Sequence, residues 1–198
     1  MANLHVAPET NAAPERPAFD LPHTVISRPL DAFVRVVGEA FSWIWVVLIL
    51  LIVGNVFLRY VVGRNFIALE EMQWHLFSIG FMMGLGYTLL KDGHVRVDVL
   101  AEHWSDRRRA AIEFLGLVLF LGPFLYFVIV YAVPFVQRSW ALNEVSAAPG
   151  GLPARWAIKS VIIIAFGFLA IAAFSRLTRV TALLFRFPRP RREDGTPA

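Results

Sequence analysis

The chain has no cysteine among its 198 residues, and this absence removes two kinds of site at once. It can build neither a disulfide framework nor a thiolate metal site. Charge is also scarce, because Asp, Glu, Lys and Arg make up 17% of the residues whereas hydrophobic residues make up 57%. An average soluble domain has about 25% charged residues. The composition therefore predicts an integral membrane protein.

Several motifs of enzyme chemistry are missing as well. The sequence holds no Gly-rich phosphate loop and no HExxH zinc pair. A bis-histidine haem would need two histidines at similar depth in the membrane, and His75 alone lies within an apolar run. No acidic residue lies at mid-membrane depth, so a proton or sodium relay has no evident member. We expect no catalytic residue, no metal and no cofactor.

Two further functions are disfavoured by pattern. The net charge is +4, but the basic residues flank apolar runs and form no interleaved basic and aromatic surface, so we expect no nucleic acid partner. Secondary transporters usually show repeated halves with interrupted helices around a midplane site. The apolar runs here are few and mostly continuous, which argues against transport by this chain alone.

Four apolar runs are present, at about 36–58, 69–90, 110–136 and 156–177. Each can cross a hydrocarbon core, which takes about 20 helical residues. Lipid cannot satisfy backbone polar groups, so each run should be a helix. The predicted fold is all-α with four transmembrane helices: a flexible, proline-containing tail over 1–32, a membrane domain over 33–180 and a basic C-terminal tail over 181–198.

The distribution of basic residues predicts the orientation. Fourteen of the nineteen Lys and Arg residues lie in the N-terminal segment, the second loop and the C-terminal segment, whereas five lie in the first and third loops. Short cytoplasmic loops carry the excess of Lys and Arg. We therefore expect both termini and the second loop to be cytoplasmic, with the first and third loops on the outer side.

This orientation brings one group of charged residues together at the outer face. Arg59 ends the first run, and Glu70 and Glu71 begin the second, where the positive end of the helix dipole favours carboxylates. A clamp between the first two helices is the leading interpretation. A contact to another subunit and a ligand for a coupling ion or substrate remain alternatives. Trp74 is expected to anchor the second helix at headgroup level.

Within the second run, Gly80 and Gly84 form a GxxxG pair. Small residues one turn apart let another helix approach closely in lipid. The pattern predicts close packing and leaves the partner open, either inside the chain or in another protein. At the opposite face the second loop carries Asp92, Gly93, His94, Arg96 and Asp98, a membrane thickness away from the outer cluster.

The order and spacing of these features resemble the small membrane subunit, DctQ-like, of tripartite ATP-independent periplasmic (TRAP) transporters. The resemblance covers about 33–180 and also includes the inner-loop sequence DGHVRVDVL, similar to a Gly-His-x-x-x-Asp pattern of the family. The segment NEVSAAPGGLPARWAIK is similar to a branch whose partners tend to handle organic acids. The residues that carry the resemblance at the outer face are Asn55, Arg59, Tyr60, Glu70, Glu71 and Trp74.

The resemblance implies a multi-pass subunit of the bacterial inner membrane with no catalytic role. It would act as a scaffold for a large transmembrane subunit that imports carboxylates with the sodium gradient, supplied by a periplasmic substrate-binding protein. The outer cluster would then support the first helix hairpin or its contacts, and the Asp92–Asp98 segment would shape the inner loop. A membrane anchor or assembly subunit of another complex, such as a redox enzyme, is the alternative.

Two basic residues at the start of the fourth run add one further hypothesis. Arg155 and Lys159 are four residues apart, on one helical face near the outer headgroups. They could reach the phosphates of membrane lipids. Alternatively they could form a docking patch for the binding protein or for an acidic residue of the large subunit.

Overall fold

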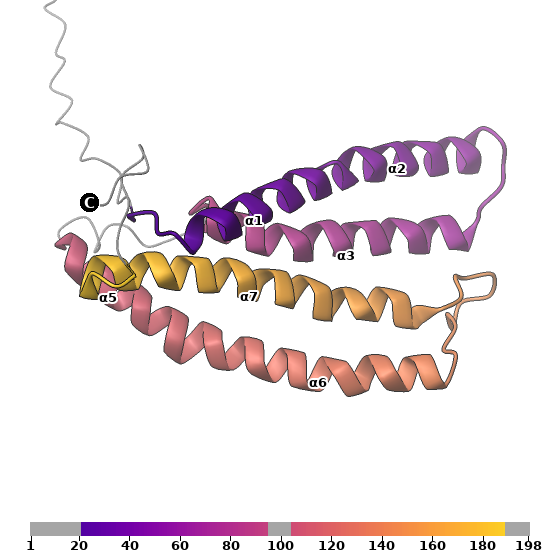
Figure 1. The fold of residues 1–198 in the computed structure, drawn as a ribbon. Coiled ribbons are helices and arrows are strands. Elements are labelled where there is room, and N and C mark those ends of the chain that lie inside the picture. The colour runs from indigo at the N-terminus through magenta and orange to yellow at the C-terminus, as the bar shows by residue number, and fades with distance from the viewer. Residues whose placement is uncertain (1–20, 95–103, 189–198) are drawn as a thin grey trace, which may run out of the picture.

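The computed structural model describes residues 21–94 and 104–188, which form helices and loops without a strand. Figure 1 shows two long helical hairpins side by side, one made by α1, α2 and α3, the other by α5, α6 and α7. The elements are α1 (Ser27–Ser42), α2 (Ile44–Tyr60), α3 (Ile67–Leu90), α5 (Asp106–Leu115), the π-helical η1 (Gly116–Leu121), α6 (Gly122–Ala141) and α7 (Arg155–Phe185).

The two ends of this bundle differ. The loops 61–66 and 142–154 lie together at one end, which we call the hairpin end (Figure 1). The start of α1, the end of α3, the start of α5 and the end of α7 lie at the other, which we call the terminal end. Glu71 and Arg59 belong to the hairpin end, and Asp92 belongs to the terminal end.

Three helical stretches are long and apolar enough to cross a membrane: Ser27–Tyr60, Asp106–Ala141 and Arg155–Phe185. The prediction of an all-helical membrane protein is confirmed for the part of the chain that the structure describes. The 24-residue helix α3 is not among these three stretches, and Glu70, Glu71, Gln73 and His75 make its first turns polar. It nevertheless packs along both α2 and α7, so it runs beside two of the three apolar stretches, Ser27–Tyr60 and Arg155–Phe185 (Figure 1).

Helix α1 begins earlier than the predicted first span, inside the segment expected to be a flexible tail. The Ser27 amide donates to Thr24 Oγ1 and the Thr24 amide donates to Ser27 Oγ, both at 2.9 Å, which is the reciprocal pattern of a capping box. Leu21 and Thr24 are buried against the rest of the bundle. A serine in place of the usual Glu or Gln hid this helix start from a reading based on apolar runs.

Helix α7 likewise continues to Phe185, beyond the predicted end of the fourth run and into the predicted tail. Its last turns bury a polar face that includes Ser175, Arg176 and Thr178. These side chains make hydrogen bonds within the bundle, which stabilise the end of α7 although it is polar. The helix is therefore longer than its apolar run, and apolar runs alone underestimate its length.

Helices α3 and α7 form the centre of the bundle. The main core cluster consists of Val34, Met83, Leu89, Leu125, Ala165, Phe168, Leu169 and Ala172. It draws residues from α1, α3, α6 and α7, so both hairpins share one core. Two edge-to-face ring contacts extend it, Phe33 with Phe168 and Phe124 with Phe166, at centroid distances of 6.2 and 5.8 Å.

Candidate functional site

The outer cluster expected from the sequence is divided in the structure. Arg59 Nη1 on α2 lies 3.9 Å from Glu70 Oε1 on α3, and both side chains are partly exposed. The Arg59 guanidinium also lies 5.9 Å from the centre of the Tyr60 ring. Exposed pairs at this distance contribute at most about 1 kcal/mol. Asn55 is buried on α2, one turn before Arg59.

Glu71 points to a different partner, the loop that joins α6 to α7. Its Oε2 accepts a hydrogen bond from the Leu152 amide at 2.7 Å, and its Oε1 accepts one from Ser146 Oγ. The loop is closed on itself by the Ser146 amide, which donates to the Leu152 carbonyl at 3.1 Å. A single carboxylate on the first hairpin thus holds the loop of the second hairpin.

Glu144 organises the same loop from within. Its amide donates to the Ser139 carbonyl at 3.0 Å, and its carbonyl accepts from the Arg155 amide at 2.9 Å. Its carboxylate accepts hydrogen bonds from Lys159 Nζ and from Ser139 Oγ, the latter at 2.7 Å. Both bonds favour the ionised form, so they hold the pKa of the Glu144 carboxyl below its usual value.

The two basic residues considered for contact with lipid phosphates or, alternatively, for a docking patch have different surroundings. Lys159 pairs with Glu144 and lies 4.2 Å from the centre of the Phe135 ring, so its charge is neutralised within the hairpin. Arg155 is exposed at the first position of α7. The structure thus separates Arg155, which lines an open cleft beside α3, from Lys159, which is paired with Glu144 of the α6–α7 loop.

An open cleft of about 420 Å³ lies between α3 and α7 at the hairpin end. Glu70, Glu71 and His75 give it polar groups, and the exposed Trp74 forms part of its wall. Its full lining is Ile67, Glu70, Glu71, Trp74, His75, Ser78, Ala148, Arg155 and Ile158. Within the described ranges, no cluster of three or more His, Asp or Glu side chains could hold a metal ion.

At the terminal end, Arg176 on α7 is the central charged residue. Its side chain is 6% exposed. Nη2 donates to Asp92 Oδ1 at 3.0 Å, Nη1 donates to the Leu89 carbonyl at 3.1 Å, and Nε donates to Glu113 Oε1. This one guanidinium therefore joins α7 to the end of α3 and to α5. Sequence reasoning used Arg176 only for orientation and did not consider Glu113.

The end of α3 is shaped for this contact. The Gly93 amide donates to the Thr88 carbonyl at 3.0 Å and the Asp92 amide to the Leu89 carbonyl at 3.4 Å, which is a Schellman motif. Asp92 takes the left-handed position with φ 58°, where glycine is the usual residue. Its carboxylate, which a glycine would lack, is the group that binds Arg176. His94 is exposed, whereas Arg96 and Asp98 lie outside the described residues.

A second polar contact at the terminal end fastens α1. Asp31 accepts a hydrogen bond from Ser175 Oγ and lies 3.5 Å from His23 Nδ1 and 4.0 Å from Arg179 Nη1. The Arg179 side chain also donates to the Leu21 carbonyl at 2.7 Å. The start of α1 is thereby tied to the end of α7.

Of the predicted pair Gly80 and Gly84, only Gly80 lies close to a neighbouring helix. A Cβ at Gly80 would lie 2.8 Å from Ile44 and 3.2 Å from the Trp45 ring, so Gly80 does allow a close approach, to residues at the start of α2. A Cβ at Gly84 would have nothing within 4 Å. Gly86 is the tighter position, because a Cβ there would lie 2.6 Å from Phe168 Cδ1 on α7.

One comparison with known proteins gives a match. A family model described as "Tripartite ATP-independent periplasmic transporters, DctQ component" matches residues 48–183. This range begins within α2 and includes α3 to α7 nearly to its end, so it contains the second hairpin and most of the first, without α1. No curated protein and no solved structure matches the chain.

Proposed function

The chain belongs to the DctQ component family of tripartite ATP-independent periplasmic transporters, and we propose that it is the scaffold that holds the moving parts of such a transporter in the bilayer. It does no transport chemistry itself. It works with a large transmembrane subunit and a periplasmic binding protein to import organic-acid carboxylates with the sodium gradient. The family match favours this role over an anchor for a redox enzyme.

The observation that carries the proposal is the way α3 and α7 are fastened at both ends. Glu71 holds the α6–α7 loop at the hairpin end, and Arg176 joins α7 to α3 and α5 at the terminal end. The strongest charged contacts are therefore engaged in helix-to-helix links. A bundle fixed in this way resists internal motion, which suits a support for a partner that moves.

Orientation and span number form part of the proposal. Helix α3 has 24 residues and is about 36 Å long at 1.5 Å per residue, enough to cross a core of about 30 Å. We take it as a fourth span in the bacterial inner membrane, with both termini cytoplasmic and the hairpin end periplasmic. Roles of the outer cluster and of Gly93 and His94 in supporting contacts belong to the same proposal.

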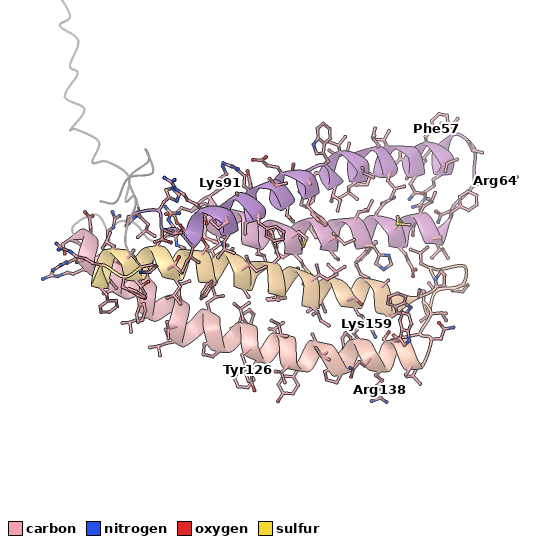
Figure 2. The ribbon with its side chains drawn as sticks, viewed as in Figure 1. Phe57, Arg64, Lys91, Tyr126, Arg138 and Lys159 are labelled. Carbon is pink, nitrogen blue, oxygen red and sulfur yellow. The ribbon has the colours of Figure 1, made fainter. Side chains whose placement is uncertain are left out.

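The absence of cysteine makes the orientation directly testable. Single replacements Arg64→Cys and Lys91→Cys lie at the hairpin end and the terminal end, respectively (Figure 2). A membrane-impermeant maleimide added to the periplasmic side should label the first and not the second. Labelling of Lys91→Cys alone would show that the orientation is the reverse of the proposed one. Equal labelling of both variants would contradict the proposal that α3 crosses the membrane.

The function itself is tested by co-expression. The chain should copurify with a large multi-span subunit, and vesicles containing both should take up a carboxylate when the binding protein and a sodium gradient are supplied. Vesicles with the large subunit alone should not. Uptake that is equally fast without this chain would disprove the scaffold role.

A further inference from the structure

Two helices present broad apolar faces outward, and the two faces differ in composition. The exposed face of α2 is mainly aliphatic, with Val46, Val47, Ile49, Leu50, Val53 and Val56. The exposed face of α6 and the end of η1 is aromatic, with Phe120, Phe124, Tyr126, Phe127, Tyr131 and Phe135. Figure 2 shows Tyr126 directed away from the bundle on the α6 side and Phe57 directed away on the α2 side.

The aromatic face carries two hydroxyl groups at a depth where lipid has no hydrogen-bond partner for them. Counted along the helix from Trp140 at the hairpin end, Tyr131 lies about 14 Å and Tyr126 about 21 Å away at 1.5 Å per residue. In a hydrocarbon core of about 30 Å, both residues lie well inside the core, with Tyr131 near its middle. The side chains of Tyr126 and Tyr131 are 64% and 69% exposed.

Within the described ranges, neither phenol oxygen makes a hydrogen bond. A polar group left without a partner in the hydrocarbon is costly, because no water competes for it. An aliphatic face such as that of α2 has no such cost in lipid. The two hydroxyls therefore distinguish the α6 face from a lipid-facing surface.

The rings around these hydroxyls are arranged as a continuous patch. Phe127 and Tyr131 are stacked with centroids 6.4 Å apart and an interplanar angle of 14°, and Tyr126 meets Phe127 edge to face at 5.7 Å. Residues 120, 124, 127 and 131 follow the three- and four-residue spacing of one helical face. Rigid aromatic side chains are enriched at protein interfaces, where they lose little conformational entropy on binding.

We infer that the α6 face bearing Tyr126, Phe127 and Tyr131 is the surface on which a transmembrane helix of the large transporter component docks, and that this helix supplies hydrogen-bond partners to both phenols at mid-membrane depth. The inference rests on the proposed function, because the family is that of a multi-component transporter. The α2 face is then the one that contacts lipid. The occupant is a helix with polar side chains or an opened backbone near its middle.

Photo-crosslinking in the assembled complex tests the assignment of faces. A photoreactive p-benzoyl-phenylalanine is placed at Phe127, which is 55% exposed, or at Leu50 on α2, which is 67% exposed and serves as the matched control. Phe127 should crosslink to the large component and Leu50 should not. A crosslink to the large component from Leu50 alone would overturn the inference. So would crosslinking of Phe127 only to a second copy of this chain or only to lipid.

Removing the hydroxyls tests the hydrogen bonds separately from the apolar contact. The double variant Tyr126→Phe with Tyr131→Phe keeps the rings, so its thermal stability as an isolated chain should be unchanged. Its association with the large component in detergent should weaken about sevenfold, from two interhelical hydrogen bonds of average strength in membrane proteins. Tyr87→Phe, whose ring lies against Gly38 of α1 inside the bundle, is the control and should have no effect. Unweakened association of the double variant would show that the phenols have no partner there.

These outcomes are distinguishable from failure of the proposed function. If uptake does not depend on this chain, the scaffold role is lost whatever the crosslinks show. If uptake depends on the chain but Phe127 does not crosslink to the large component, only the docking surface is wrong.

Discussion

Arg176 Nη2 lies 3.0 Å from Asp92 Oδ1, although the two residues are 84 apart in the chain. The same guanidinium donates from Nη1 to the Leu89 carbonyl, so it contacts both the last turn of α3 and the turn that follows it. The carboxyl end of a helix carries partial negative charge and favours a cation. Arg176 therefore acts as a tertiary cap for α3, supplied by α7.

Replacing Arg176 by methionine should destabilise the chain by about 3 kcal/mol, because it removes the guanidinium from a mostly buried ion pair with Glu113. The midpoint of thermal unfolding in detergent measures the effect. Arg138→Met is the matched control, since Arg138 is exposed on α6 and points away from the bundle (Figure 2), and it should change the midpoint little.

A second substitution separates the charge from the packing. Adding Glu113→Gln to Arg176→Met neutralises the carboxylate that faced Arg176 and should recover part of the lost stability. If the double variant is as unstable as the sum of the two single variants, Arg176 and Glu113 do not act together.

Glu71 and Glu70 are adjacent but should respond very differently to alanine. Glu71→Ala removes a charged acceptor from the Leu152 amide and from Ser146, and should lower the unfolding midpoint clearly. Glu70→Ala breaks only the exposed 3.9 Å pair with Arg59 and should cost no more than about 0.5 kcal/mol. Hydrogen exchange of the loop 142–154 should accelerate in the first variant alone. Equal effects of the two substitutions would contradict the link between hairpins.

Alanine at two glycines of α3 should have opposite effects. At Gly86 a methyl group would collide with the Phe168 ring at 2.6 Å, so Gly86→Ala should destabilise by about 1–3 kcal/mol. At Gly84 the space is open, and Gly84→Ala should be neutral or stabilising by about 0.5 kcal/mol because alanine is the better helix former. Unfolding midpoints of the isolated chain measure both. If Gly84→Ala were destabilising, another group would have to lie close to Gly84, which contradicts the open space at this position.

The Glu144 carboxyl makes the α6–α7 loop sensitive to acid. Its pKa is lower in the folded chain than the usual 4.5, so folding favours the ionised form. The stabilisation is complete above pH 4.5 and is lost as the pH falls through the lower pKa of the folded state. The difference in unfolding midpoint between the parent chain and Glu144→Gln should therefore be constant from pH 6 to about pH 5 and shrink below pH 4.5. A difference that grows on acidification would reverse the sign of the coupling.

Apolar runs were sufficient to predict the helices but not their ends. Apolar runs of membrane length predict where a helix crosses lipid, and α2, α3 and α6 fall within or near the predicted runs. Outside the hydrocarbon, polar contacts determine where a helix begins and ends. The capping box at Thr24 and Ser27 and the buried face around Arg176 extend α1 and α7 beyond their apolar runs.

At the candidate site, too, the sequence predicted part of the structure: it identified charged residues but not their partners. Charge and position led to Glu70, Glu71 and Asp92, but the sequence alone could not say that Glu71 reaches across to Leu152 rather than to Arg59. That partner is 81 residues away and depends on how the two hairpins pack. A signal for Arg176 and Glu113 was present but was not used: the predicted orientation puts Arg176 and the start of the third apolar run, which contains Glu113, at the same membrane face.

The central claim is that this chain supports a transporter without taking part in ion or substrate binding. The most direct measurement is carboxylate uptake by vesicles containing the complete transporter with Arg59→Glu, Glu71→Ala or Arg176→Met, normalised to the amount of assembled complex. Each variant should lower the amount of complex and the total uptake rate, with unchanged KM for substrate and unchanged dependence on sodium. Normal assembly combined with an altered KM or an altered sodium dependence would contradict the claim.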